Sequence, residues 1–328
     1  MKKKVYLRTA VSALSSLLIT TAALQASAQD WPTKPIRIVS PYAAGGVGDT
    51  IFRLIAPAME AKLGQRFVID NKTGAAGNIG TAEVVNSKPD GYTFLFAPTA
   101  NFAVNQHLFP NLGFNPVTQL DVVYTVAEAP LIAVTGPTGP ATMKEFASQA
   151  RSNPQKFNFG SPGAGSPTHL AGVSFSQIAG NTIQHIAYRG TPPLVLAMLS
   201  GDVQLAFPTL TPVVTQLKSN RLKAIAVMSN QRMPELPNVP TTVEAGFPEL
   251  VFGNWWVLAG PKGVDPKIVE KFASEIRAVL ADPATRTKLN EIGHVAYNLG
   301  PAETAAFIRT ESTRYKTLIE RNAIKLDQ

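Results

Sequence analysis

The run Ser40-Pro41-Tyr42-Ala43-Ala44-Gly45-Gly46-Val47-Gly48-Asp49 joins two segments of different periodicity. Before it, residues 36–39 read Ile-Arg-Ile-Val, which is typical of a buried strand. After it, apolar residues recur at helical spacing from Ile51 to Leu63 and form one stripe that can face a core. The pattern predicts a strand-to-helix turn with Asp49 as the N-cap of the helix.

This turn has the features of an anion site. Its three glycines at positions 45, 46 and 48 allow the backbone to turn sharply with no side chain in the way. Such a turn directs several unpaired N–H groups and the positive end of a helix dipole at one point, which suits a carboxylate or a phosphate. Glycine-rich turns are also common without a ligand, so the turn alone leaves both interpretations open.

Residues 1–28 carry the pattern of a cleavable signal peptide. Lys2-Lys3-Lys4 and Arg8 precede an uncharged, mostly apolar run over residues 11–24, and Ala26-Ser27-Ala28 matches a cleavage site. We therefore expect a mature chain that begins near Gln29 and is exported to the periplasm. The apolar run is too short for a membrane span and no later stretch is long enough, so no membrane span is expected.

Composition excludes several classes of protein. The formal net charge is +8, but four of the 30 Lys and Arg lie in the signal peptide, which leaves 26 basic against 22 acidic residues and a net charge of +4. A mildly basic chain without a basic run gives no reason to expect a nucleic-acid partner. With no Cys and four scattered His, neither disulfides nor a structural zinc site is expected. A mature chain of about 300 residues suggests two domains.

Strand and helix patterns alternate along the mature chain, which predicts an α/β fold with mostly parallel sheets. Strand patterns fall at residues 36–39, 67–69, 93–96, 121–128, 131–134, 157–159, 183–186, 202–207, 222–227 and 254–259. Helix patterns begin near residues 51, 79, 143, 167 and 191, and two further helices, from about 266 and from 301, are expected after Pro261. The run Gly136-Pro137-Thr138-Gly139-Pro140 is the sharpest change in composition and predicts a boundary.

Glycine-rich turns recur in both halves of the chain. Four turns, at residues 41–49, 71–79, 160–168 and 188–193, are rich in Gly, Pro, Ser and Thr. In open α/β sheets, ligands bind outside the carboxyl ends of the strands, where such turns gather. The recurrence therefore favours a ligand cleft between two α/β lobes.

Enzyme motifs fit the chain poorly. Position 51 is Ile, so Gly46-Val47-Gly48 lacks the third glycine of a dinucleotide fingerprint, and no turn ends as a phosphate-binding P-loop does. Gly165-Ser166-Pro167 is not a hydrolase elbow, and Ser166 is expected to cap a helix. His169 and His185 lack metal-ligand spacing, so no metal or other cofactor is expected. A secreted hydrolase that uses Ser161 or Ser166 with His169 is the alternative from the enzyme class.

Several motifs in a fixed order carry a resemblance to a known family. In the first half they are Trp31-Pro32-Thr33-Lys34-Pro35-Ile36-Arg37, Pro41-Tyr42-Ala43-Ala44-Gly45-Gly46 with Asp49, Gly64-Gln65, Asn71 with residues 74–80, and Pro89-Asp90-Gly91-Tyr92-Thr93. In the second half they are Gly160-Ser161, Gly165-Ser166, His169-Leu170-Ala171-Gly172, Tyr188-Arg189-Gly190 and Gly201-Asp202-Val203. By their order and spacing, over essentially its whole mature length, the chain resembles the periplasmic solute receptors of tripartite tricarboxylate transporters, often called Bug proteins.

The resemblance implies a two-lobed clamp of the type II periplasmic binding protein class, each lobe a mostly parallel sheet flanked by helices. Lobe 1 would comprise residues 29–124 and 254–328, and lobe 2 residues 125–253, with strands near 122–134 and 250–258 crossing the hinge. The family consists of carboxylate receptors and not of enzymes. It implies membrane permease subunits as partners, with presentation of the ligand to a sensor kinase as an alternative. We expect a monomer without a cofactor.

The resemblance also implies how the ligand is held. The family binds a carboxylate with backbone N–H groups and ordered waters at the first two turns, and Asp49 belongs to the lobe 1 side of the site. Many relatives carry an Asp in the segment that reads Phe207-Pro208-Thr209 here, so we expect a mono- or dicarboxylate without an amino group, aromatic ones included. The expected ligand-binding residues are Tyr42, Ala44, Gly45, Gly46, Val47, Gly48, Asp49, Gly74, Ala75, Ala76, Gly77, Asn78, Thr99, Asn101, Ser161, Ser166, Thr168, His169, Tyr188, Arg189, Phe207 and Thr209.

Overall fold

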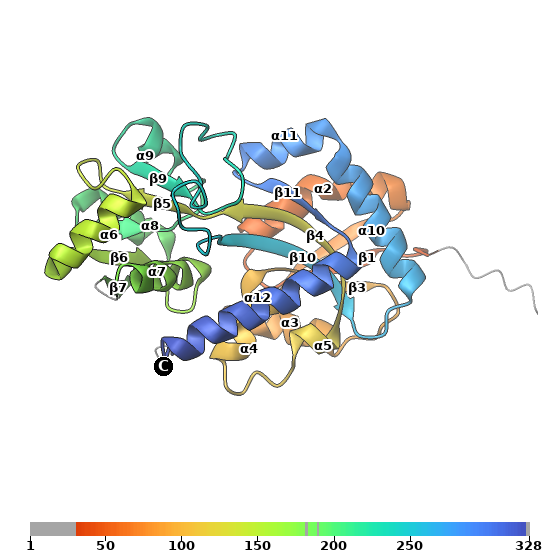
Figure 1. The fold of residues 1–328 in the computed structure, drawn as a ribbon. Coiled ribbons are helices and arrows are strands. Elements are labelled where there is room, and N and C mark those ends of the chain that lie inside the picture. Colours follow the sequence, from red (N-terminus) through yellow and green to blue (C-terminus); the bar gives the residue numbers. More distant parts are fainter. Residues whose placement is uncertain (1–30, 181–182, 189, 326–328) are drawn as a thin grey trace, which may run out of the picture.

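Two sheets, each covered by helices, form two lobes that meet at a hinge (Figure 1). The computed structural model describes residues 31–180, 183–188 and 190–325. The predicted signal peptide and the expected mature start at Gln29 lie outside these residues. Among the described residues, no helix has both the length and the apolar character needed to cross a bilayer.

Both sheets are mixed. The six-stranded sheet of lobe 1 has the order β11 (Val295–Leu299), β4 (Leu120–Pro130), β10 (Gly253–Pro261), β3 (Thr93–Pro98), β1 (Ile36–Ser40) and β2 (Phe67–Asn71). The five-stranded sheet of lobe 2 has the order β7 (Gln184–Ala187), β6 (Asn158–Ser161), β8 (Leu205–Ala206), β5 (Ile132–Thr135) and β9 (Lys223–Val227). The pairs β1–β2, β1–β3, β6–β7 and β6–β8 are parallel, and the remaining pairs are antiparallel.

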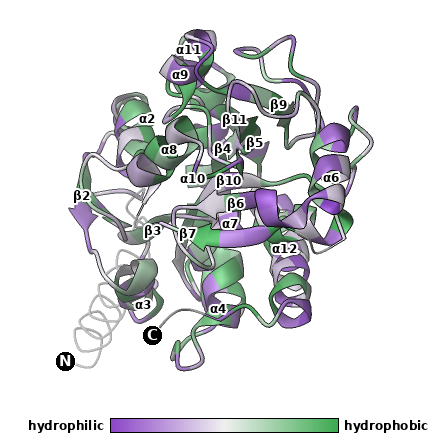
Figure 2. Cartoon of the chain, turned by 90° about the vertical axis from the view of Figure 1, so that its left-hand side faces the viewer, coloured by the Kyte–Doolittle hydropathy of each residue, from purple (hydrophilic) through white to green (hydrophobic). Residues whose placement is uncertain are grey.

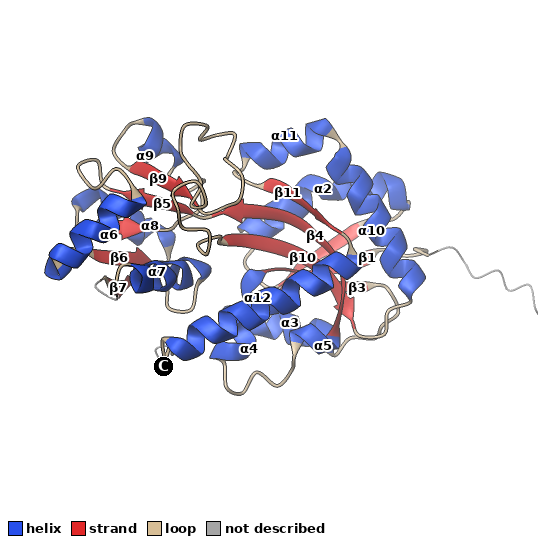
Figure 3. Cartoon of the chain, viewed as in Figure 1, coloured by secondary structure: helices blue, strands red, loops and turns tan. Residues whose placement is uncertain are grey.

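Helices lie on the outside of the sheets (Figure 3). Lobe 1 carries α2 (Val47–Leu63), α3 (Asn78–Val85), α4 (Asn105–Leu108), α5 (Pro116–Gln119), α10 (Pro266–Ala281), α11 (Pro283–Glu291) and α12 (Pro301–Arg321). Lobe 2 carries α6 (Met143–Ser152), α7 (Pro167–Ile178), α8 (Thr191–Ser200) and α9 (Val214–Lys218). Single turns of 3₁₀ or π type occur at η1 (Ala75–Gly77), η2 (Ala100–Val104) and η3 (Pro154–Lys156).

Strand β3 illustrates how the core of lobe 1 is divided. Phe94 and Phe96 pack into one cluster with residues of α2 and α10, whereas Leu95 and Ala97 pack into the other with residues of α3 and α12. A strand buried on both faces is a continuous apolar run and not an alternation, and this is why residues 93–96 were recognisable from sequence. Each buried apolar side chain of this size contributes about 1.5–3 kcal/mol. Figure 2 shows the hydrophobic colour on central strands such as β4, with hydrophilic segments on outer helices such as α6 and α12.

The chain crosses between the lobes twice, and the two crossings lie side by side. β4 leads out of lobe 1 through Leu131 into β5, and the chain returns through Phe252 into β10. The N–H of Leu131 donates to the carbonyl of Phe252 (3.0 Å), and the N–H of Met228 donates to the carbonyl of Leu131 (2.8 Å). β4 and β10 are antiparallel because one leaves and the other returns, and this accounts for the mixed sheet where mostly parallel pairing was expected.

β4 remains paired with β10 as far as Pro130, within the stretch near residues 122–134 that was expected to cross the hinge. Three sequence-based expectations differ from the structure. The run at residues 136–140 is the connection from β5 to α6 within lobe 2, so its turn residues mark a loop and not a lobe boundary. The strand expected over residues 202–207 is confined to Leu205–Ala206.

The third difference lies after Pro261, where three helices and the strand β11 replace the two expected helices. The unpredicted helix α11 is mostly polar and buries only Thr285 and Leu289, so it shows almost no apolar stripe. β11 pairs irregularly with β4 at the edge of the sheet, and none of its five residues is fully buried, so it lacks the alternation of a half-buried strand.

Candidate functional site

A cleft of about 660 Å³ lies between residues of both lobes. Lobe 1 contributes the β1–α2 turn, Ala76 and the segment from Pro98 to Phe109, and lobe 2 contributes the β6–α7 turn. β10 adds Asn254 and Trp256. Among the described residues, the cleft lining contains no charged side chain: it consists of Tyr42, Ala43, Gly46, Val47, Gly48, Ala76, Pro98, Ala100, Asn105, Leu108, Phe109, Pro162, Gly163, Ala164, Gly165, Ser166, Pro167, Asn254 and Trp256.

The β1–α2 turn leaves backbone donors unpaired. α2 begins at Val47, and its N-cap, Gly46, supplies no side chain that could accept a hydrogen bond from the first helical turn. The N–H of Gly46 donates to the carbonyl of Ala43 (3.0 Å). The N–H groups of Val47, Gly48 and Asp49 have no partner among the described residues, and two of these three residues line the cleft. The start of α2 therefore has both the free donors and the dipole end that stabilise an anion.

Asp49 holds this turn in place. It lies in the first turn of α2 and not at the N-cap, so the expected cap is wrong, because the helix begins two residues before Asp49. Its buried carboxylate accepts hydrogen bonds from the N–H of Gly45 (2.9 Å), Arg53 Nε (2.8 Å) and Asn71 Nδ2 (3.4 Å). The hydrogen bond from Arg53 is the main cause that holds the pKa of Asp49 below its usual range. The carboxylate is thus committed to the turn and does not line the cleft.

The second turn, after β2, has a strained backbone. Ala75 (φ 47°) and Ala76 (φ 53°) have the left-handed conformation, followed by Gly77 (φ 84°). This conformation costs a non-glycine residue roughly 1–2 kcal/mol, so the surroundings must hold it. The carbonyl of Ala76 accepts hydrogen bonds from the side chains of Tyr42 (3.2 Å) and Asn105 (3.1 Å). The N–H of Ala76 has no partner among the described residues.

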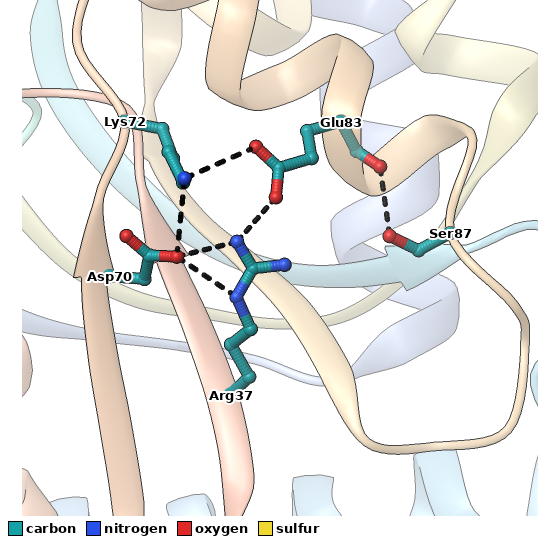
Figure 4. Close-up of polar contacts among 5 residues, drawn as sticks. All are labelled: Arg37, Asp70, Lys72, Glu83 and Ser87. Atoms are coloured by element: carbon teal, nitrogen blue, oxygen red, sulfur yellow. Dashed lines mark hydrogen bonds and ion pairs between the residues drawn. The ribbon is translucent and has the colours of Figure 1, made fainter.

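An ion-pair network joins the strands and the helix next to this turn (Figure 4). Arg37 on β1 donates to Asp70 on β2 (Nε to Oδ2, 3.0 Å) and to Glu83 on α3. Lys72 lies between the same two carboxylates, at 3.7 Å from Asp70 and 4.0 Å from Glu83. The network ties β1, β2 and α3 together and so fixes the two ends of the second turn.

The β6–α7 turn on the lobe 2 side is more fully hydrogen-bonded. Ser166 is the N-cap of α7, as predicted: its hydroxyl accepts from the N–H of His169 (3.2 Å) and donates to the carbonyl of Gly163 (2.7 Å). Pro167, the first helical residue, has no N–H, and the N–H of Gly165 donates to His169 Nδ1 (3.0 Å). The N–H groups of Ala164 and Thr168 have no partner among the described residues.

Two stacked histidine rings lie next to the β6–α7 turn. The rings of His169 and His185 lie 3.9 Å apart, and Phe159 stacks on His185 at 4.9 Å. Burial lowers the pKa of His169 to about 3, with a smaller contribution from His185, so the His169 ring is neutral and its Nδ1 can accept the N–H of Gly165.

The pairing of Ser161 or Ser166 with His169 that the hydrolase alternative requires is not formed. Ser166 is occupied as a helix cap, and the hydroxyl of Ser161 lies 2.8 Å from Nε2 of His185 instead. Ser161 is fully buried, so its hydroxyl is closed to a substrate carbonyl. A nucleophile must reach the atom that it attacks, and the geometry gives no support to the hydrolase alternative.

Several predicted site residues support the cleft without lining it. Asn101 accepts from the hydroxyl of Tyr42 (3.0 Å) and donates to Thr81 (3.0 Å), and Asn78 accepts from Asn105 (2.6 Å). Thr99 accepts from the N–H of Trp255 (2.9 Å) and so fastens β3 to β10. The turn residues Ala44, Gly45, Gly74, Ala75, Gly77 and Thr168 are also outside the lining.

Three further candidates are absent from the cleft lining. Phe207 is buried in the core, where it packs against Phe175. Tyr188 packs against the apolar cluster of lobe 2, and Thr209 does not line the cleft. Arg189 lies outside the described residues.

Sequence reasoning missed Asn105, Leu108, Phe109, Asn254 and Trp256 as lining residues. Within loops that it did predict, it also left out Ala43, Pro98, Ala100, Pro162, Gly163, Ala164, Gly165 and Pro167. Asn254 and Trp256 belong to a strand that was predicted, but only the pairing of β10 with β3 and β4 shows which of its faces meets the cleft. Asn105 to Phe109 follow the loop after β3, and the position of a loop at a strand's carboxyl end was the available signal. Among the described residues, no group of three or more His, Asp or Glu could hold a metal ion.

Two α/β lobes that enclose such a cleft are the architecture of clamp-type binding proteins. The sequence model of the tripartite tricarboxylate transporter family receptor matches residues 51–324, and the chain belongs to this family.

Relatives and solved structures agree with this assignment. Protein BugT of Bordetella pertussis is 31% identical over 97% of this chain and 99% of its own length. The structure of R. palustris Rpa4515 with adipate is 29% identical, with a TM-score of 0.77 over 90% of this chain and 99% of that chain. The structure of MatC from Rhodopseudomonas palustris with bound malate is 27% identical, with a TM-score of 0.72 over 88% of this chain and 100% of that chain.

Proposed function

We propose that this chain is a periplasmic receptor that captures a small carboxylate without an amino group and delivers it to the membrane permease of a tripartite transporter. The observation that carries the proposal is that the starts of α2 and α7 meet at one cleft with unpaired N–H groups, while none of the described lining side chains is charged. The adipate and malate in the two related structures support a carboxylate as the class of ligand.

Backbone donors alone can supply useful affinity. A hydrogen bond to a charged group contributes roughly 1.5–3 kcal/mol net. Three or four of them could supply about −8 kcal/mol, the free energy of micromolar binding, before the costs of ordering are subtracted. A ligand that contacts both lobes also stabilises the closed clamp, in proportion to its preference for that state.

An ammonium group would be poorly matched. The carboxylate of Asp49 is already held by Gly45, Arg53 and Asn71, and no other acid reaches the cleft among the described lining residues. A buried charge without a partner is costly, so amino acids should bind much more weakly than their deaminated analogues. The apolar lining residues Val47, Leu108 and Phe109 suit a ligand with an apolar body, aromatic ones included.

The proposal also includes the processing of the chain, its oligomeric state and the extent of its two lobes. Residues 1–28 are removed on export, the mature protein is a monomer, and it has no enzymatic activity. Lobe 1 comprises the residues before Leu131 and after Phe252, and lobe 2 the residues between, close to the boundaries expected from sequence. Loss of ligand uptake in cells that lack the chain would support delivery to a permease; loss of a transcriptional response with normal uptake would favour the sensor-kinase alternative.

The test is a ligand panel followed by calorimetry. Succinate, malate, adipate and benzoate are compared with aspartate, glutamate and the uncharged succinamide at constant ionic strength. Acids that bind should raise the melting temperature, since a ligand at 100 times its Kd adds about 2.7 kcal/mol of stability. Tighter binding of aspartate or glutamate than of every deaminated acid would overturn the proposal, as would turnover of ester substrates that is lost in Ser161→Ala.

A further inference from the structure

We propose that the indole N–H of Trp256 donates a hydrogen bond to the ligand carboxylate beside the start of α2. This inference deepens the proposed function and rests on it. It assigns one side-chain donor to a site in which the donors described above are backbone groups.

Trp256 is placed by the alternation of strand β10. Trp255 and Trp256 point to opposite faces: Trp255 packs edge-on against Phe307 at 5.1 Å, and Trp256 packs edge-on against His294 at 4.9 Å. Trp256 is one of the residues that line the cleft, although only 3% of it is exposed.

The indole N–H of Trp256 is a free donor. In the described residues, Trp31 Nε1 donates to the carbonyl of Gly91 (2.9 Å), and Trp255 Nε1 is enclosed without a partner. Trp256 Nε1 has no partner among the described residues and is not enclosed in this way. A tryptophan N–H in a nearly buried position normally finds a partner, so a free one at a cleft wall points to a ligand.

Gly48 shows which edge of the ring meets the turn. A Cβ atom at position 48 would lie 3.1 Å from Nε1 and 3.3 Å from Cδ1 of Trp256. The N–H edge of the indole therefore faces the first turn of α2, beside the unpaired backbone N–H groups of that turn. The absence of a side chain at Gly48 keeps this corner open.

The chemistry of this corner suits a carboxylate. A carboxylate has two oxygens with about four acceptor positions, and the first turn of α2 offers three unpaired N–H groups. The indole N–H donates and cannot accept, so it adds to anion binding and offers nothing to an ammonium group. The backbone donors of α2 can hold one oxygen while Trp256 holds the other.

The test compares two tryptophans on the same strand. Trp256→Phe keeps an aromatic ring and deletes the donor, and Trp255→Phe makes the same change on the opposite face of β10. We expect the Kd of the panel acids succinate, malate, adipate and benzoate to rise about 10- to 100-fold in Trp256→Phe and to stay near the wild-type value in Trp255→Phe. Circular dichroism and melting curves establish that both variants are folded at the temperature of measurement.

A spectroscopic measurement distinguishes loss of the hydrogen bond from a change in side-chain packing as the cause of a lower affinity. The sequence has three tryptophans, so ¹⁵N-indole spectra of the mature protein contain few signals, which the two variants assign. We expect the Trp256 indole proton to move downfield and to exchange more slowly with solvent when a binding acid is added, while the Trp255 signal stays in place. Wild-type affinity in Trp256→Phe, or an unmoved Trp256 signal at saturation, would overturn this inference alone. Absence of binding by every acid to the wild type would overturn the proposed function and this inference with it.

Discussion

Helices α2 and α7 both begin at the cleft, but their first turns are built differently. α2 has a glycine N-cap with no side chain to accept a hydrogen bond, and three of its N–H groups are unpaired. α7 has a serine N-cap, a proline in first position and a histidine ring that accepts a further N–H. Donors are thus left free on lobe 1 and are mostly satisfied internally on lobe 2.

This difference indicates that the two lobes have different roles in ligand binding. The unpaired N–H groups of an uncapped helix start destabilise the protein unless water or a ligand accepts hydrogen bonds from them. For that reason an uncapped start is the better anion site. A capped start is stable without a ligand and can serve as a preformed wall. We therefore expect a carboxylate to bind lobe 1 first and lobe 2 to close over it.

Val47→Pro should have the largest effect. Proline is well tolerated as the first residue of a helix, and Gly46 before it is extended (ψ 169°), as proline requires of its neighbour. The substitution deletes one unpaired N–H, so the Kd of a binding acid should rise about 10- to 100-fold with little change in melting temperature.

Val47→Ala is the matched control for that prediction. It removes the side chain of Val47, which is 49% exposed, and keeps the N–H. Calorimetry of both variants separates the contribution of the Val47 N–H to affinity from that of the Val47 side chain. Equal affinities for Val47→Pro and Val47→Ala would contradict a role for this N–H.

Ser166→Ala should act mainly on stability. Loss of the N-cap of α7 costs about 1 kcal/mol, which corresponds to a fall of about 2 °C in melting temperature for a chain of this size. The Kd should change less than in Val47→Pro, because the hydroxyl of Ser166 is committed to Gly163 and His169. Ser166→Thr retains a capping hydroxyl and should melt near the wild type. A larger loss of affinity than in Val47→Pro would reverse the assigned roles of the two lobes.

Acid should weaken the lobe 2 turn through His169. Its pKa falls from an ordinary value near 6.5 in the unfolded chain to about 3 in the folded one, so between these values the unfolded chain binds more protons. The stability that the neutral ring provides is complete above pH 6.5 and is lost as the pH falls toward 3. Urea unfolding at pH 7 and pH 4.5 should show a larger drop for the wild type than for His169→Gln; equal drops would contradict the assignment.

Arg37→Met should have the smallest effect. The network of Arg37 with Asp70 and Glu83 is about one-third exposed, and such ion pairs contribute at most about 1 kcal/mol. Lys72 remains near both carboxylates, so we expect a loss of a few tenths of a kcal/mol that shrinks at 1 M salt. Chemical denaturation at low and high salt measures this loss of stability, with Lys316→Met, which removes an exposed ion pair with Glu320, as the control.

Much of the fold follows from local patterns in the sequence. β3 and β10 are mostly apolar runs buried on both faces, and the apolar stripe of α2 and the prolines in the first turn of α8 are equally local signals. Patterns fail where burial is slight, as in α11, whose stability comes from packing on α2 and α10 and not from a stripe of its own.

Sequence patterns place the helix starts less well than the helices themselves. Asp49 has the chemistry of an N-cap, yet Gly46 holds that position because the extended conformation falls there and the carboxylate reaches back to the N–H of Gly45. Which of Gly46 and Asp49 is the N-cap depends on where the backbone is extended. Residue types alone do not fix this position, because glycine adopts many backbone conformations.

The amino-acid sequence by itself determined most of the strands and helices and the glycine-rich turns that join them. These depend on neighbours within a few positions along the chain. Only the tertiary structure decided that His169 lies against His185, that Ser161 is closed off, and that the N–H edge of Trp256 meets the start of α2. Such contacts depend on strand register and on how segments far apart in sequence pack together, and a one-residue shift in β10 would exchange the faces of Trp255 and Trp256.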